Sequence, residues 1–71
     1  MEITYSPDID AMNITFSDNE VVQTVEFRTN VYFDLDADGN IVNIEILAAS
    51  QLMTNPNDIR FMTLAAAQRE K

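Results

Sequence analysis

The fold prediction depends on the stretch VYFDLDADGNIVNIEI, residues 31–46, because the pattern of this stretch fits two incompatible structures. Its acidic residues and glycine stand at the ligand positions of a calcium-binding EF-hand loop that begins at Asp34 and ends at Glu45. Its apolar residues also alternate with polar ones on either side of Asp38 and Gly39. An Asp-Gly pair flanked by such alternation is typical of a tight β-hairpin. The flanking residues are therefore needed to distinguish a calcium-binding loop from a β-hairpin.

The flanking residues favour the hairpin. An EF-hand loop needs an entering helix, but residues 20–33 are rich in β-branched residues, which are stiff at χ1 and poor in helices. A two-residue turn at Asp38 and Gly39 brings four pairs face to face: Leu35 with Val42, Phe33 with Ile44, Val31 with Ile46, and Tyr32 with Glu45. The first three pairs are apolar and share one face, so the sequence predicts a hairpin. The remaining calcium hypothesis is a weak site made by Asp34, Asp36, Asp38 and Glu45.

Alternation of apolar and polar residues continues through the first two thirds of the chain and predicts five strands. Their expected ranges are residues 2–5, 11–16, 20–27, 31–36 and 41–47. The turns between them are short and contain Pro, Asp, Asn and Ser. Because parallel strands need long crossovers, short connections favour antiparallel neighbours. A five-stranded antiparallel β-meander is the simplest arrangement.

The alternation ends after residue 47. Residues 48–53 are compatible with a helical turn, and Asn55 and Pro56 are typical of the start of a helix. A helix is predicted over residues 57–69, with an apolar stripe of Ile59, Met62 and Ala66 beside Phe61 and Ala65. The expected fold is α+β, in a single domain of residues 1–71 that divides into a β-meander at 1–50 and a helical extension at 54–71.

The predicted helix is narrower than the predicted sheet. One helix covers a width of about 10 Å, whereas five strands span about 20 Å. The apolar face of the sheet therefore needs the helix, a partner subunit or both to cover it. We expect a homo-oligomer, with the helix packed on its own sheet or on that of a partner.

The charge is acidic and unevenly distributed. The chain has 12 Asp and Glu against 4 Lys and Arg, a net charge of −8. Residues 1–54 hold ten acids and one base, a net of −9, and residues 55–71 hold two acids and three bases, a net of +1. Such a charge repels nucleic acid and attracts a basic protein. The candidate partner-binding residues are Asp34, Asp36, Glu45, Phe61 and Met62.

The composition argues against catalysis and against a cofactor. The chain has no Cys and no His, which are the usual zinc ligands, and its single Gly excludes a glycine-rich phosphate loop. Two pairs of aspartates, Asp8 with Asp10 and Asp34 with Asp36, are the one candidate for acid–base chemistry. A role in shaping turns is the simpler expectation for Asp8 and Asp10. Without a signal peptide or a long apolar run, a cytoplasmic protein is expected, with no contact to a membrane.

Two stretches, ITYSPDIDAMNITF and VYFDLDADGNIVNIEILAAS, together resemble a small bacterial family catalogued as domain of unknown function 2283. The resemblance covers about residues 2–50. Its matching residues include Tyr5, Pro7, Asp10, Ala11, Ile14, Asp34, Asp36, Gly39, Ile41, Val42, Ile44, Glu45, Ile46, Leu47, Ala49 and Ser50. It implies a small β-meander without an established activity or catalytic residues. Some members lie beside small toxin-like proteins, which implies an antitoxin role for part of the family.

Three functional hypotheses follow. The first is a non-catalytic, antitoxin-like interaction module that binds a basic protein. The second is a phage-type DNA mimic that inhibits a nucleic-acid-binding protein. The third is a weak calcium-binding module that uses the loop from Asp34 to Glu45.

Overall fold

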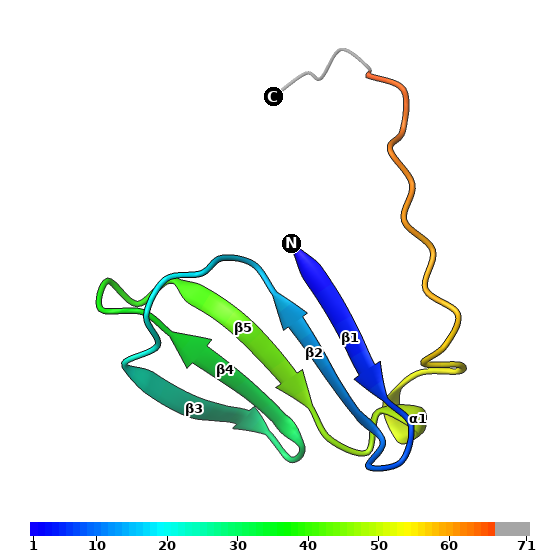
Figure 1. Ribbon diagram of the computed structural model, residues 1–71, viewed down its shortest axis with the longest axis horizontal. Helices are drawn as coiled ribbons and strands as arrows, with labels where there is room; N and C mark the ends of the chain where they lie inside the picture. Colours follow the sequence, from blue (N-terminus) through cyan, green and yellow to red (C-terminus); the bar gives the residue numbers. More distant parts are fainter. Residues whose placement is uncertain (67–71) are drawn as a thin grey trace.

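The computed structural model describes residues 1–66 and has a five-stranded antiparallel sheet with one short helix (Figure 1). The elements are β1 (Glu2–Ser6), β2 (Ala11–Thr15), β3 (Gln23–Arg28), β4 (Val31–Leu35), β5 (Ile41–Ile46) and α1 (Ala49–Leu52). The α+β class and all five predicted strands are thus confirmed. No helix in this part of the chain is long and apolar enough to cross a membrane.

The strands lie side by side in the order β1-β2-β5-β4-β3. A strictly sequential order would place β3 next to β2, but here β2 pairs with β5. The hairpin of β1 and β2 is therefore joined to the three-stranded meander of β3, β4 and β5. This order puts the strands with the most buried residues, β2 and β5, near the middle of the sheet, where Met12 pairs with Ile46.

Alternation along each strand gives the sheet two different faces. We call one the apolar face; it carries Ile3, Tyr5, Met12, Ile14, Val25, Phe27, Val31, Phe33, Ile44 and Ile46. We call the other the polar face; it carries Glu2, Thr4, Asn13, Thr15, Thr24, Glu26, Tyr32, Asp34, Asn43 and Glu45.

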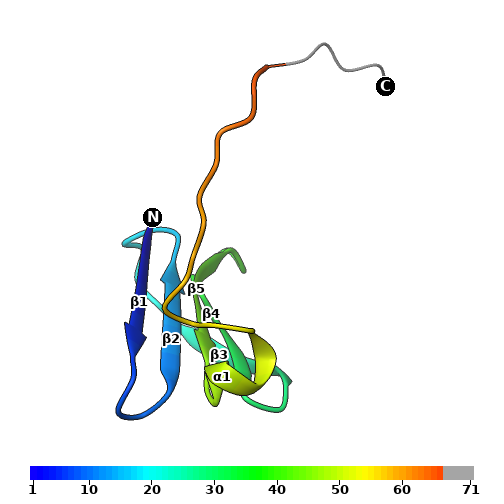
Figure 2. The same cartoon turned by 90° about the vertical axis from the view of Figure 1, so that its right-hand side faces the viewer.

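The core lies at one end of the apolar face, beneath α1. Met12, Ile46 and Ala49 are its buried centre, and Tyr5, Ile14, Ile44 and Met53 pack against them. Met12 is only 1% exposed and is the largest fully buried side chain. Figure 2 shows α1 at one end of the sheet, so that the helix covers only part of the apolar face.

The central hairpin confirms most of the predicted register and corrects its last pair. Phe33 pairs with Ile44, Val31 with Ile46, and Tyr32 with Glu45, as predicted. The predicted pair of Leu35 with Val42 is wrong, because the register shifts after Asp34 and Leu35 pairs with Ile41.

The register shifts because the turn has three residues instead of two. The backbone N–H of Asp36 donates to the carbonyl of Asn40 at 3.0 Å, and the N–H of Gly39 donates to the carbonyl of Asp36 at 3.1 Å. Gly39 has φ of 82°, in the left-handed region that this turn requires. The Asp36 side chain accepts from the N–H groups of Asp38 and Asn40, which stabilises the longer turn.

The predicted helix at residues 57–69 is also corrected. Residues 58–66 are not helical, and residues 67–69 lie outside the described part of the chain. The helix is instead α1, in the segment that the sequence allowed as a helical turn. Residues 58–66 are all exposed, so no tertiary contact stabilises a helix there. Short isolated helices are marginal in water, which explains the difference.

Candidate functional site

The polar face is an extensive set of polar side chains that crosses all five strands in two rows. The first row, in strand order, is Glu2, Thr15, Asn43, Asp34 and Thr24. The second row is Thr4, Asn13, Glu45, Tyr32 and Glu26. With strands about 4.8 Å apart, each row is about 19 Å long.

A hydrogen-bond network centred on Asn43 links four strands of this face. Thr15 Oγ1 donates to Asn43 Oδ1 at 2.8 Å. Asn43 Nδ2 donates to Asn13 Oδ1 at 3.0 Å and to Asp34 Oδ2 at 3.1 Å. Thr24 Oγ1 donates to Asp34 Oδ1 at 2.6 Å. Because each side chain restrains its neighbours, the network holds the middle of the polar face in a defined geometry.

The polar face carries only negative charge. Its two rows contain the carboxylates of Glu2, Glu26, Asp34 and Glu45 and no Lys or Arg. The Glu26 carboxylate accepts from the Tyr32 hydroxyl at 3.4 Å. Carboxylates in rows that contain no basic side chain attract guanidinium and ammonium groups.

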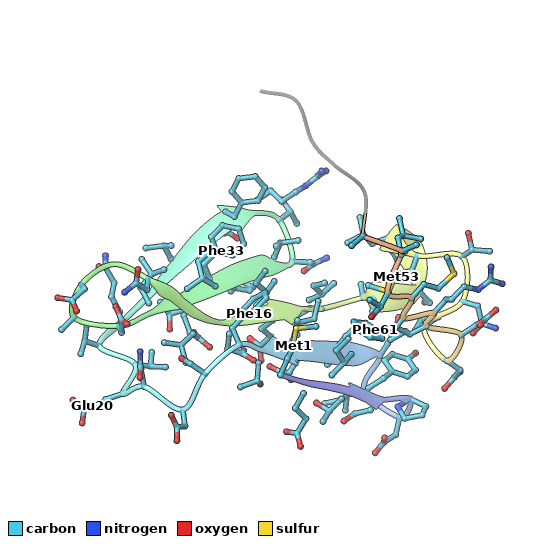
Figure 3. The ribbon with its side chains drawn as sticks, turned by 90° about the horizontal axis from the view of Figure 1, so that it is seen from above. Met1, Phe16, Glu20, Phe33, Met53 and Phe61 are labelled. Carbon is cyan, nitrogen blue, oxygen red and sulfur yellow. The ribbon has the colours of Figure 1, made fainter. Side chains whose placement is uncertain are left out.

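The structure separates the five predicted partner-binding residues into three places. Asp34 and Glu45 lie together on the polar face. Asp36 lies in the turn between β4 and β5. Phe61 and Met62 lie in the segment after α1 and are 83% and 60% exposed. Figure 3 shows Phe61 at the α1 end of the molecule and Glu20 at the opposite end.

Asp36 is buried, and its carboxylate accepts hydrogen bonds from the turn and from the loop before β3. Its side chain is 8% exposed. The carboxylate accepts from the backbone N–H groups of Asn40 and Asp38, both at 2.9 Å, and from the amides of Asn19 at 3.0 Å and Asn40 at 3.3 Å. These bonds, that from the Asn40 N–H above all, hold the pKa of Asp36 below its usual value although desolvation opposes them. Asp36 is therefore a turn-forming residue.

The four carboxylates of the calcium hypothesis do not converge. Asp34 bonds Thr24 and Asn43, Asp36 bonds the turn, Asp38 is exposed at the tip, and Glu45 lies opposite Tyr32 in the second polar row. Within residues 1–66, no three or more acidic side chains are grouped to hold a metal ion. The antiparallel strands spread these side chains apart, whereas a calcium loop wraps its oxygens around one ion.

Replacing Asp36 by alanine is expected to lower the melting temperature by several degrees, because two backbone N–H groups of the turn lose their acceptor. The matched control is Asp38→Ala, which removes the same charge from the exposed tip of the same turn. Thermal unfolding followed by circular dichroism at pH 7 compares the two. Equal losses in both variants would contradict the role of Asp36.

A second polar cluster, around Asp10, ties the first turn to α1. Tyr5 Oη donates to Asp10 Oδ1 at 2.7 Å. The Ser50 backbone N–H donates to the same oxygen at 3.0 Å, and Ser50 Oγ donates to Asp10 Oδ2 at 2.6 Å. The N–H of Ala49 donates to the Asp10 carbonyl at 3.0 Å. Since Ala48, at the helix start, gives no side-chain cap, Asp10 satisfies the first N–H groups of α1 from a distant part of the chain.

This cluster changes the pKa of two of its members. Hydrogen bonds from Ser50 first, and then from Tyr5, lower the pKa of Asp10. The hydrogen bond to Asp10, together with burial and the Asp10 charge, raises the pKa of Tyr5. The sequence predicts a turn-shaping role for Asp10, with acid–base chemistry as the alternative, and neither prediction includes the contact with α1. The one signal for the wider cluster was that Tyr5, Asp10 and Ser50 all match the family pattern.

The aspartates considered for acid–base chemistry do not meet. Asp10 lies near the end of β5 that leads to α1, and Asp36 lies at the start of β5. A strand of this length separates them by about 15–20 Å. Asp10 bonds Tyr5 and Ser50 and Asp36 bonds its turn, so each carboxylate has a structural role.

Comparison with known proteins gives one match. The family described as "Protein of unknown function (DUF2283)" matches residues 2–50, which include all five strands and the start of α1. Neither the curated proteins nor the solved structures gave a match. Because the match covers well over half of the chain, this protein belongs to the DUF2283 family.

Proposed function

We propose that this protein is a non-catalytic interaction module whose polar face binds a basic segment of another protein. The observation that supports it is the pair of polar rows with four carboxylates and no basic side chain. An extended segment advances about 3.3 Å per residue, so about six residues would span a row of about 19 Å. Two or three Lys or Arg residues in such a segment would meet the carboxylates.

The rigidity of the face strengthens this proposal. Asp34 is oriented by Thr24 and Asn43, so a partner's guanidinium loses little free energy in ordering it. The net charge of −8 adds long-range attraction, which steers a basic partner toward the protein and weakens as salt increases.

The role we propose for the complex is antitoxin-like: the acidic module neutralises a basic, toxin-like protein. The DNA-mimic alternative has weaker support. Duplex DNA presents one charge per about 1.7 Å of axis. Four carboxylates along rows of about 19 Å present only one charge per about 5 Å.

The test is a double substitution on the polar face, Glu26→Gln with Glu45→Gln. The matched control is Asp18→Asn with Glu20→Gln, which removes two charges from the loop between β2 and β3. A basic protein captured from the native host by the wild-type chain is titrated against all three proteins. The face variant is expected to bind about threefold to tenfold more weakly, whereas the control keeps the wild-type affinity. Equal weakening in both variants, or binding that ignores salt, would contradict the proposal.

The antitoxin-like role has its own test. It predicts that a small basic protein is encoded beside this chain, and the experiment expresses that protein in the host with and without the chain. Growth is expected to stop without the chain and to recover with it. Recovery that is equally strong with the face variant would show that the polar face is not the neutralising surface.

A further inference from the structure

The apolar face is covered at one end only. Beneath α1 it forms the core, but its other end carries Val25 and Phe33, which are half-buried, and Phe27, which is 65% exposed. The rings of Phe27 and Phe33 stack with centroids 5.0 Å apart at 14°. Ile3, at the opposite edge, is 38% exposed. A large apolar surface of this kind marks an interaction site in a soluble protein.

The segment after α1 also exposes apolar side chains, which could cover the uncovered part of the apolar face. Four large apolar side chains stand within six residues: Ile59, Phe61, Met62 and Leu64 are 47%, 83%, 60% and 75% exposed. Figure 1 and Figure 2 show this segment leaving the sheet past β1 and running away from it. The radius of gyration is 14.6 Å, against about 11 Å for a compact chain of this length.

The exposed area is larger than a monomer of this size needs. A compact monomer of 8.0 kDa exposes about 4,450 Å². This chain exposes 5851 Å². The excess of about 1,400 Å² exceeds the roughly 800 Å² that each partner contributes to an interface of standard size.

We infer that residues 59–64 of one copy pack on the apolar face of a second copy, in a reciprocal homodimer. A two-fold axis makes the same contact twice and closes the assembly, so neither segment nor face stays uncovered. Each contact would place Phe61 and Leu64 against the surface around Phe27 and Phe33.

Two observations favour a second copy over the chain's own sheet. The first is the direction of the chain: Pro56 is buried, and Asn55 forms a turn with Asn57 and Asp58 that sends the segment away from its sheet. The second is charge: residues 55–71 carry a net of +1 and residues 1–54 a net of −9. In the dimer, the weakly basic segment of one copy therefore packs on the acidic sheet of the other. This contact offsets the electrostatic repulsion between the two acidic sheets.

This dimer does not depend on the proposed function. The contact uses the apolar face, and the polar face points to the other side of the sheet. Both copies would thus keep their polar faces exposed, and the dimer would bind two basic segments.

The test begins with the mass in solution. Size exclusion with light scattering is expected to give twice 8.0 kDa for the wild-type chain. Phe61→Asp with Leu64→Asp, the segment variant, is expected to give a monomer. Both side chains are exposed, so the fold of each subunit is not at risk. Ile9→Asp is the matched control, because Ile9 is 69% exposed in the turn before β2, and this variant should remain a dimer.

A mixing experiment separates exchange from direct pairing of the sheets. Phe27→Asp, on the apolar face, is expected to be a monomer, but an equal mixture of this variant with the segment variant should form dimers. In that mixture one intact segment meets one intact face. A monomeric wild-type chain, a segment variant that still dimerises, or a mixture that stays monomeric would overturn the inference. Circular dichroism of each variant checks that the sheet is intact.

Discussion

Replacing Met12 by alanine is expected to lower the free energy of unfolding by about 2–5 kcal/mol, as is usual for a large side chain removed from a core. Met12, on β2, is 1% exposed and packs with Ile46 of β5 and Ala49 of α1. The other buried apolar side chains of the described chain are few, so little can collapse into the cavity. At about 0.05–0.15 kcal/mol per residue, the whole chain is stable by only about 4–10 kcal/mol.

Urea and thermal unfolding at a fixed protein concentration measure this loss. A loss of 2 kcal/mol corresponds to a fall of about 8–16 °C in melting temperature for a domain of this size. Met12→Leu is the matched control, because it keeps the volume and should cost less than about 1.5 kcal/mol. If alanine and leucine cost the same, Met12 is not the centre of the core.

Replacing Asp10 by alanine is expected to produce the second large effect, a fall of many degrees in melting temperature. The change removes the acceptor for Tyr5 Oη, for the Ser50 N–H and for Ser50 Oγ. Asp10 also has φ of 54°, a region that aspartate tolerates better than alanine. The first turn and α1, 40 residues apart in the sequence, then lose the side-chain bonds that join them and keep only the backbone bond from the Ala49 N–H to the Asp10 carbonyl.

The effect of Asp10 depends on pH in a defined direction. Because its pKa is lowered in the folded chain, the carboxylate stabilises the fold fully above the ordinary value of 3.8. That contribution is lost as the pH falls through the lower, folded pKa. The difference in stability between wild type and Asp10→Ala should thus be largest near neutral pH and shrink below about pH 4.

Asp8→Ala is the matched control for both measurements, since Asp8 is an exposed aspartate in the same turn. It removes the same charge and should leave the melting temperature close to that of the wild type. An Asp10→Ala variant whose deficit stays constant from pH 7 to pH 2.5 would show that backbone strain, and not the carboxylate, causes the loss.

The central hairpin shows how far local sequence reasoning reaches. Alternation predicted that Phe33 faces Ile44 and Val31 faces Ile46, because a slip by one residue would move every apolar side chain to solvent. It did not predict the pair of Leu35 with Ile41. An Asp-Gly pair fits turns of two or three residues, and the hydrogen bonds of the Asp36 side chain decided between them.

The segment after α1 shows where prediction from the local sequence fails. Asn55, Pro56 and the helix formers that follow predicted a helix at residues 57–69. Propensity alone stabilises a short helix poorly, and residues 58–66 find nothing to pack against in a single chain. The prediction that Phe61 and Met62 bind a partner remains, and the proposed exchange of segments gives it a specific form.

The sequence predicted the acidic residues of the candidate site but not the hydrogen-bond network centred on Asn43. Asp34 and Glu45 were chosen from their charge, and strand alternation correctly placed them on one face. Asn13 and Thr15 come from a strand about 30 residues away, so their bonds with Asn43 depend on β2 pairing with β5. Nothing in the local pattern specifies that pairing.

The sequence by itself determined the five strands, their apolar and polar sides, and the acidic character of the chain, because alternation and charge are local properties. Only the tertiary structure decided the order of the strands and the bond between Asp10 and Ser50. It also decided that the Asp36 carboxylate bonds the turn and that the segment after α1 is exposed. These features depend on which distant groups meet, and the free energy of such contacts does not appear in any short window of the chain.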